Sequence, residues 1–190
     1  MNIDPIRMYL LGGLMAHKLI WEILKRRAAA DCGRLVQPFQ VKLVKVGKIL
    51  ILGGVLAQTV MPDVLPIAAN TAILRTGGAL VFTAGLAVAV LGRIQLGDNW
   101  LDIELAGVKH TQTVVSKGVY GFIRHPIYVG DLALLCGLEL ALNSWLFLCV
   151  AVLAPVVLRQ AVAEERMLVQ SLPGYALYCQ RTKRFLPFVA

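Results

Sequence analysis

Two residues that could bind an anion, Arg124 and His125, and a proline stand directly before an apolar run of the chain. The sequence reads RHPIY over residues 124–128, and apolar residues follow. Pro126 suits the first turn of a helix, because its missing N–H would have no partner there. The N–H groups of residues 127–129 would then be free at a helix N-terminus, where anions bind readily. The pattern predicts an anion-binding site with Arg124 and His125 as further donors, although a capping His125 and an Arg124 that extends to a membrane surface explain it equally well.

A pair of acids, Glu164 and Glu165, stands near the end of the last apolar run. Acids are unfavourable at a helix C-terminus, so a helix that ended here would misplace them. If the helix continues to about Ser171, the pair lies in its interior and one acid can face the protein core. The alternative is a solvated acidic face that balances Arg159 and Arg166. Together with the basic motif, the acids predict a site for a ligand that carries both an ammonium and a carboxylate.

The elements that position these residues are predicted to be membrane helices. The chain has 190 residues, of which 58% are hydrophobic and only 16% are charged, whereas soluble domains have about 25% charged residues. A membrane-spanning helix needs about 20 mostly apolar residues. Five stretches fit or approach this length: 5–24, 43–61, 70–92, 127–143 and 145–163. We therefore expect an all-α integral membrane protein with about five transmembrane helices, three of them in residues 1–92 and two in a catalytic region, 93–190.

The distribution of basic residues predicts the orientation of these helices. Lysines and arginines are frequent between the first two stretches, between the third and fourth, and after the fifth, whereas the connection 62–69 has none. This is the positive-inside pattern, so the N-terminus is expected outside and the C-terminus in the cytoplasm, in a plasma, inner or endoplasmic reticulum membrane. The net charge of +8 is then membrane-flanking charge, and no nucleic-acid partner is expected. Both motifs would lie at the cytoplasmic boundary of the bilayer.

Two connecting segments have patterns of their own. Residues 98–117 alternate apolar and polar side chains around Ala106–Gly107, which predicts a short hairpin or an ordered loop. Residues 164–187 predict a helix extension, a break at Pro173–Gly174 and a second short amphipathic helix. Asn143–Ser144 predicts a tight turn between the last two helices.

Asp131 lies about one turn inside the fourth apolar stretch. An ionisable residue inside a membrane helix is a functional candidate by default, so Asp131 is a candidate site residue. His17 lies in the first stretch and is interpreted as a packing residue. The four cysteines and three histidines show no metal-ligand spacing, and no metal is expected.

The order of the motifs resembles that of the isoprenylcysteine carboxyl methyltransferase family, within a wider group that includes phospholipid N-methyltransferases. The resemblance covers about residues 93–187. It rests on Gly118-Val-Tyr120, Arg124-His-Pro-Ile-Tyr128-x-Gly130, Glu164–Glu165, Gly174-Tyr175-x-x-Tyr178 and Phe185-Leu-Pro187.

The resemblance implies an integral membrane enzyme that uses S-adenosyl-L-methionine. The predicted ligand with an ammonium and a carboxylate agrees with it, because the methionyl end of this cofactor carries both groups. Carried over by position, the cofactor-binding residues are Gln112, Thr113, Val114, Val115, Gly118, Tyr120, Arg124, His125, Pro126, Ile127, Tyr128 and Glu164.

Two positions depart from the family pattern. Eukaryotic carboxyl methyltransferases have a histidine at the position of Gln112, and here His110 lies two residues away. They also have a substrate-contacting arginine four residues before the glutamate that matches Glu164. This sequence has Gln160 there and Arg159 one residue earlier. A shift of one residue turns a helical side chain by about 100°, so Arg159 would point in a different direction.

The implied reaction is methyl transfer to a hydrophobic acceptor that enters from the lipid bilayer. The first candidate acceptor is the carboxylate of a prenylcysteine-type substrate, which needs no general base. The second is a phospholipid amine, from which Glu165 or Asp131 would take a proton. The candidate catalytic residues are Arg159, Glu165 and Asp131.

Two readings of other classes remain beside this one. A non-enzymatic membrane protein would carry the same charges only as topology signals. An NADPH-dependent reductase of the sterol type has a related C-terminal architecture, but such reductases are usually longer and have more spans.

Overall fold

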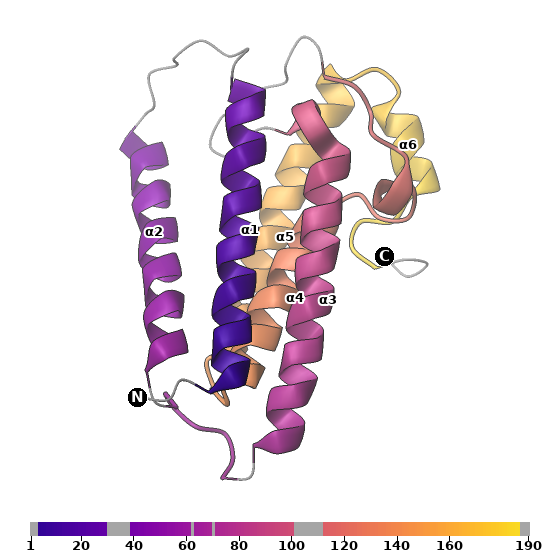
Figure 1. Ribbon diagram of the computed structural model, residues 1–190. Helices are drawn as coiled ribbons and strands as arrows, with labels where there is room; N and C mark the ends of the chain where they lie inside the picture. The colour runs from indigo at the N-terminus through magenta and orange to yellow at the C-terminus, as the bar shows by residue number, and fades with distance from the viewer. Residues whose placement is uncertain (1–3, 30–38, 62, 70, 101–111, 187–190) are drawn as a thin grey trace.

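Five long helices lie side by side in a computed structural model of the chain, and a short sixth helix packs at one end (Figure 1). The structure describes residues 4–29, 39–61, 63–69, 71–100 and 112–186. Within these ranges there is no β-strand, and two 3-10 turns, η1 (Gly97–Asn99) and η2 (Gly118–Gly121), connect the helices. The helices are α1 (Pro5–Ala29), α2 (Phe39–Val60), α3 (Ala72–Leu96), α4 (Pro126–Ala141), α5 (Phe147–Ser171) and α6 (Tyr175–Arg181).

The predicted all-α class and the five predicted helix positions are confirmed, but the number of membrane spans is confirmed only in part. Among the described residues, two segments are long and apolar enough to cross a bilayer, Ala72–Asn99 and Phe147–Ser171. Helix α4 has 16 residues and is therefore about 24 Å long, less than the ~30 Å of a hydrocarbon core. The predicted orientation across the membrane stays a prediction.

Helices α3 and α4 pack backbone against backbone. Glycines recur on α3 at Gly78, Gly85 and Gly92, and a Cβ at Gly78 or Gly85 would run into the backbone of α4. From the other side, a Cβ at Gly130 or Gly137 would run into the backbone of α3. Glycines permit this approach because they have no side chain. The close seam fixes where α4 begins relative to α3.

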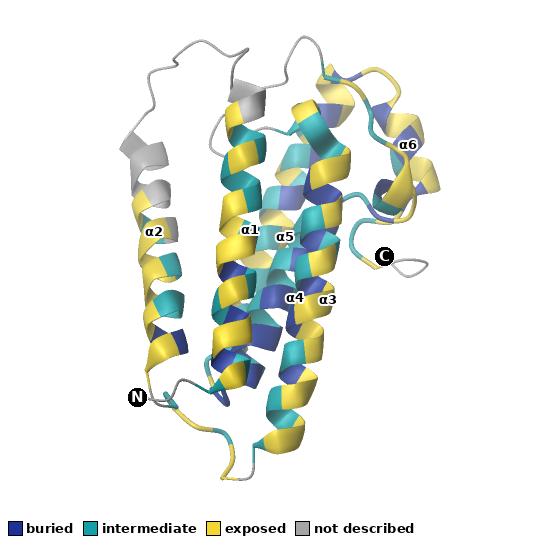
Figure 2. Cartoon of the chain, in the orientation of Figure 1, coloured by how far each residue is buried: buried dark blue, intermediate teal, exposed yellow. Residues whose placement is uncertain are grey.

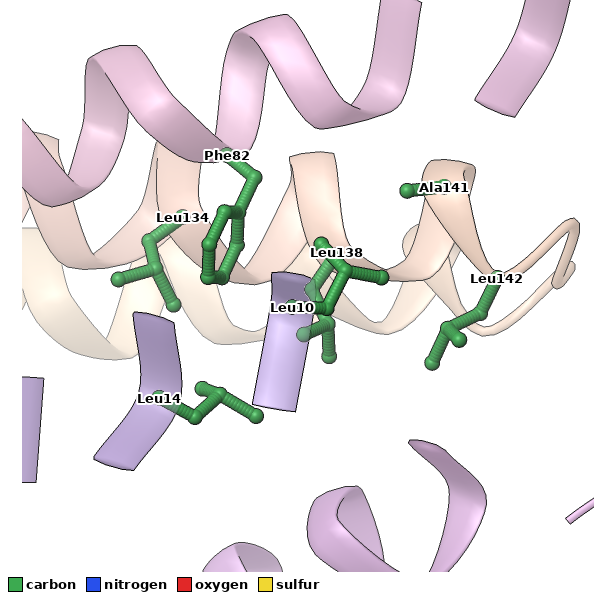
Figure 3. Close-up of a cluster of buried hydrophobic side chains, with 7 residues drawn as sticks. All are labelled: Leu10, Leu14, Phe82, Leu134, Leu138, Ala141 and Leu142. Carbon is green, nitrogen blue, oxygen red and sulfur yellow. The ribbon is translucent and has the colours of Figure 1, made fainter. Parts of the chain in front are cut away.

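The buried core lies between α1, α3 and α4. Figure 2 shows buried residues gathered on the facing sides of these helices, whereas α2 and α5 carry many exposed positions. Large apolar residues such as Ile49 and Leu50 of α2 and Val152 and Val156 of α5 are exposed, as expected of helices that face lipid. Seven side chains form the centre of the core (Figure 3): Leu10, Leu14, Phe82, Leu134, Leu138, Ala141 and Leu142.

A polar cluster closes the end of the bundle at which α4 leads into α5. Asp63 accepts hydrogen bonds from Arg7 at 2.6 Å, from Arg75 at 2.8 Å and from the Asn143 side chain at 3.1 Å. Asn143 has a φ of 57°, which asparagine tolerates better than most residues. Its side-chain oxygen also accepts from the backbone N–H of Ala68 at 3.1 Å. The turn predicted at Asn143–Ser144 is confirmed, and one asparagine serves both the turn and the cluster.

Candidate functional site

Helix α4 begins where its proline predicts. Pro126 is the first helical residue and His125 is the N-cap. Both Pro126 and Ile127 pack against Gly92 of α3, where a Cβ would lie 3.2 Å from the proline ring and 3.1 Å from the isoleucine side chain. One expectation about the free amides is wrong, because the N–H of Val129 donates to the carbonyl of His125 at 3.1 Å. This is the first i→i−4 hydrogen bond of the helix. In any helix the N-cap residue accepts such a bond from the residue four positions later, so only the N–H groups before Val129 are free.

The carboxylate of Glu165 joins the RHP motif to the C-terminal tail. It pairs with Arg124 Nε at 2.8 Å, His125 Nε2 at 3.0 Å and Arg184 Nη2 at 2.7 Å. We call these four residues the Glu165 cluster. Because α5 continues to Ser171, Glu165 lies in a helix interior and is buried, as predicted for one acid of the pair. A buried carboxylate needs such partners to offset its lost hydration.

Backbone hydrogen bonds reinforce this connection between motif and tail. The N–H of Arg124 donates to the carbonyl of Lys183 at 2.8 Å, and the N–H of His125 donates to that of Arg184 at 3.2 Å. The Arg124 guanidinium also donates to the carbonyls of Cys179 and Thr182. The RHP motif is therefore held from the side by the segment after α6.

The second acid of the pair has a different environment. Tyr128 donates its hydroxyl to Glu164 at 2.8 Å, and Glu164 is half-buried. The rings of His125 and Tyr128 stack with centroids 5.3 Å apart and planes 7° apart, and Phe185 of the tail lies 5.7 Å from the His125 ring. Three aromatic rings thus lie together, and one of them, Tyr128, is the single hydrogen-bond donor to Glu164 among the described residues.

The GVYG sequence forms the turn η2, which is fixed from two sides. Gly118 has a φ of 62°, and the N–H of Val119 donates to the side chain of Gln95 at 2.9 Å. Tyr178 of α6 donates its hydroxyl to the carbonyl of Tyr120 at 2.8 Å. Burial raises the pKa of Tyr178 to about 12, so this hydroxyl stays protonated and remains a donor. The turn is held between α3 and α6.

The segment 112–115 lies alongside the 3-10 turn η1 and α6. The N–H of Thr113 donates to the Asn99 side chain at 2.7 Å, and the amide of Gln112 donates to the Asn99 carbonyl at 3.3 Å. Val114 packs against the small cluster that includes Leu168 and Tyr175. The predicted hairpin at 98–117 falls mostly on residues 101–111, outside the described residues, and so does His110.

The three candidate catalytic residues lie in three different places. Glu165 is fully engaged in its cluster. Asp131 Oδ1 lies 3.2 Å from Nε2 of His17 on α1. Arg159 is exposed on α5, and no hydrogen bond or ion pair joins it to the other site residues that the structure describes.

A groove of about 490 Å³ borders the Glu165 cluster. This volume lies within the ~300–1,000 Å³ of small-molecule sites. Its charged residues are Arg166, Glu165 and the two arginines that pair with Glu165, Arg124 and Arg184. Apolar walls come from Val162 and Val169. The groove borders neither Tyr128 nor Glu164. Glu165 therefore lines this groove, whereas Glu164 lies outside it.

Sequence reasoning missed three residues that hold the site together, Arg184, Gln95 and Asn99, and it interpreted a fourth, His17, as a packing residue only. Arg184 directly precedes the Phe185-Leu-Pro187 motif, and that adjacency was a usable signal. Gln95 and Asn99 are ordinary polar residues after an apolar stretch, and nothing in their spacing marks them. His17 is an ionisable residue inside an apolar stretch, the same signal that singled out Asp131.

Comparison with known proteins places this arrangement in a family. A family model described as phospholipid methyltransferase matches residues 73–173. The cobalt-zinc-cadmium resistance protein CzcN of Cupriavidus metallidurans is 34% identical over 108 residues, which cover 54% of this chain and 46% of that protein. The nickel-cobalt-cadmium resistance protein NccN of Alcaligenes xylosoxydans xylosoxydans is 31% identical over 108 residues with the same coverage. The match thus spans about half the length of the curated relatives.

A solved structure has a similar fold. The eukaryotic intramembrane Ras methyltransferase ICMT (isoprenylcysteine carboxyl methyltransferase) superposes with a TM-score of 0.60 at 20% identity, covering 99% of this chain and 70% of that chain. This likeness confirms the fold implied by the motif resemblance and supports a membrane protein. Because the family model matches more than half of the chain, from the start of α3 to the end of α5, the chain belongs to the phospholipid methyltransferase family.

Proposed function

We propose that the chain is a membrane methyltransferase that uses S-adenosylmethionine and acts on a lipid-borne acceptor. The observation that carries the proposal is the pairing of Tyr128 with Glu164, at 2.8 Å, beside the stacked ring of His125. A half-buried carboxylate next to aromatic faces suits a cationic ligand, and S-adenosylmethionine carries an ammonium and a sulfonium. Family membership supports the reaction class.

The residues at the start of α4 fit this cofactor by the chemistry of their donors and acceptors. Glu164 has an acceptor oxygen beyond the one that Tyr128 occupies, and it suits an ammonium. The backbone N–H groups of Ile127 and Tyr128 lie in the first turn of α4, where they suit a carboxylate. When bound, the cofactor supplies an electrophilic methyl group on a sulfonium.

The chain itself would contribute positioning and exclusion of water. The Glu165 cluster fixes His125 relative to the tail, and η2 is fixed by Gln95 and by Tyr178 of α6. Holding a methyl acceptor in line with its donor can lower the barrier by several kcal/mol. Glu165, with three partners, acts in this proposal as an anchor for the motif and the tail.

The acceptor has two candidates. The resemblance favours the carboxylate of a prenylcysteine-type substrate, for which Arg159 would be the contact. The exposed position of Arg159 offers this candidate little support. A phospholipid amine is the second candidate, and Asp131 favours it, because a carboxylate beside the acceptor attracts an ammonium and repels a second carboxylate.

Calorimetric titration of the detergent-solubilised chain tests the cofactor. We expect S-adenosylhomocysteine to bind and NADPH not to bind. The His125→Ala and Glu164→Ala variants should lose binding, whereas Glu22→Gln, a change at a partly exposed acid of α1 that pairs with Arg26, should keep it. Absence of S-adenosylhomocysteine binding to the wild type would overturn the proposal, and NADPH binding would favour the reductase.

Transfer of a radiolabelled methyl group then identifies the acceptor class. The labelled cofactor is offered with total membrane lipids and, separately, with a farnesylcysteine analogue. Label in the lipid fraction favours the amine, and label in the analogue favours the carboxylate. Label in neither, with the cofactor bound, would contradict a lipid-borne acceptor of these two classes.

A further inference from the structure

Helix α1 contributes an ionisable group to the opening turns of α4. His17 Nε2 lies 3.2 Å from Asp131 Oδ1. This pair lies next to the apolar core that Leu14 of α1 and Leu134 of α4 form, since His17 follows Leu14 by three positions and Asp131 precedes Leu134 by three positions. Helix α1 is outside residues 73–173, the part that the family model matches. A residue beyond the family region therefore reaches into the candidate site.

The pair is open to its surroundings. The side chain of Asp131 is 41% exposed and that of His17 is 21% exposed, whereas the Glu165 side chain is 9% exposed. Among the described residues, His17 is the one hydrogen-bonding partner of the Asp131 carboxylate. Glu165 is enclosed by three partners, as expected of a structural anchor. Asp131 instead keeps one oxygen available to a ligand.

Trp21 fixes the His17 ring. The two rings stack with centroids 4.1 Å apart and planes 26° apart, and they are neighbours at i and i+4 on α1. A stacked imidazole cannot turn freely, so its Nε2 stays directed at Asp131. The corner thus combines a carboxylate with two aromatic rings, which is a combination that binds organic cations.

The position of Asp131 relates it to the cofactor candidates. Asp131 follows Tyr128 by three residues, so the two side chains lie on the same side of α4. Tyr128 holds Glu164, and Asp131 lies one turn deeper along the same helix. A ligand at Asp131 would therefore be next to a cofactor at Tyr128 and Glu164.

We infer that Asp131 is an acceptor-selecting residue that binds the cationic amine of a lipid headgroup, and that His17 is the positioning residue that holds its carboxylate. This inference rests on the proposed function. In this inference α1 helps to select the acceptor through His17, and the negative charge of Asp131 selects an amine by attraction.

Binding of two labelled lipids to the solubilised full-length chain tests the selection without any turnover. The probes are phosphatidylethanolamine and phosphatidylglycerol with the same fluorophore on an acyl chain, measured by fluorescence anisotropy. We expect the wild type to bind the amine lipid roughly tenfold more tightly, as one charge-assisted hydrogen bond provides. Asp131→Asn, which keeps the size of the side chain, should bind both lipids equally. A preference that survives in Asp131→Asn would overturn the inference.

Variants at His17 separate positioning from packing. His17→Gln can still donate a hydrogen bond to Asp131 and should retain most of the preference, whereas His17→Leu should lose it. In turnover, Asp131→Asn and His17→Leu should each raise the KM for phosphatidylethanolamine at least fivefold, while the affinity for S-adenosylhomocysteine stays unchanged. Equal loss in His17→Gln and His17→Leu would contradict the positioning role.

The cofactor titration distinguishes the two levels of failure. If S-adenosylhomocysteine does not bind to the wild type, the proposed function fails. If it binds but the wild type shows no preference between the two lipids, only the role of Asp131 fails. The Glu22→Gln variant, on the same helix as His17 and partly exposed, is the matched control and should behave as wild type.

Discussion

Arg184 holds Glu165 at two points, with Nη2 at 2.7 Å from Oε2 and Nε at 3.1 Å from both carboxylate oxygens. The two residues are 19 positions apart, and the helix α6 lies between them. Arg124 and His125 reach the same carboxylate. One acid therefore ties the tail of the chain to the start of α4.

Glu165→Gln should destabilise the chain and release its tail. The change leaves Arg124, whose side chain is 10% exposed, without its countercharge, and breaking a buried pair costs about 3 kcal/mol. We expect a lower melting temperature in detergent and faster trypsin cleavage after Lys183. Arg166→Gln, at the next residue of α5 and exposed, should leave both unchanged. Equal melting temperatures for the two variants would contradict the anchoring role of Glu165.

Tyr128→Phe should weaken cofactor binding without affecting the fold. It removes the hydroxyl that donates to Glu164 and leaves the ring stacked on His125. Loss of one hydrogen bond to a charged group corresponds to roughly a tenfold lower affinity, measured as calorimetric binding of S-adenosylhomocysteine. Tyr9→Phe, which removes a hydroxyl that contacts Thr83 on the bundle surface, is the control. Unchanged affinity in Tyr128→Phe would remove this residue from the site.

Gly78→Ala and Gly77→Ala form a matched pair on α3. A Cβ at Gly78 would run into the backbone of Ala141, whereas a Cβ at Gly77 meets nothing within 4 Å. The first change should therefore lower the free energy of unfolding by about 1–3 kcal/mol, and the second should be neutral or slightly stabilising, because alanine favours helix over glycine. Thermal unfolding in detergent checks the order of the two variants. Equal stability would mean that α3 and α4 are less close than described.

The cluster at Asp63 predicts a loss of stability at acidic pH. Burial favours the protonated carboxyl, but hydrogen bonds from Asn143, Arg7 and Arg75 outweigh it and hold the pKa of Asp63 below its usual value. The stabilisation is present above the unfolded-state pKa of about 3.9 and is lost as the pH falls through the lower folded-state value. Asp63→Asn should be less stable than wild type at pH 7, and the difference should shrink below pH 4. A constant difference from pH 7 to pH 3 would contradict the ionic character of the cluster.

Local features of the fold could be predicted because single residues decide them. Pro126 lacks an N–H and begins a helix, Gly174 has a φ of 83° and separates α5 from α6, and Asn143 occupies a turn that needs a positive φ. Each of these acts through its own backbone. The positions of the five long helices follow from the apolar runs. The inward-facing position of Glu165 follows from the length of α5, which continues to Ser171.

Contacts between distant segments could not be predicted in this way. The charge of Arg184 is evident in the sequence, but its pairing with Glu165 depends on the return of the chain after α6. The approach of His17 to Asp131 depends on the close packing of α1 with α3 and α4 around Phe82. The number of spans is confirmed only in part: two segments among the described residues are long and apolar enough to cross a bilayer, whereas α4 begins at Pro126 and ends after 16 residues.

The close seam between α3 and α4 has a consequence for where two reactants can meet. Pro126 packs against Gly92, whereas α3 continues to Leu96, four residues and about 6 Å further. The start of α4 thus forms a step below the end of its neighbour. In the proposed reaction, the water-soluble methyl donor can reach the start of α4 from the aqueous side. The lipid-borne acceptor can reach the same place from within the bilayer, so the donor does not have to enter lipid and the acceptor does not have to enter water.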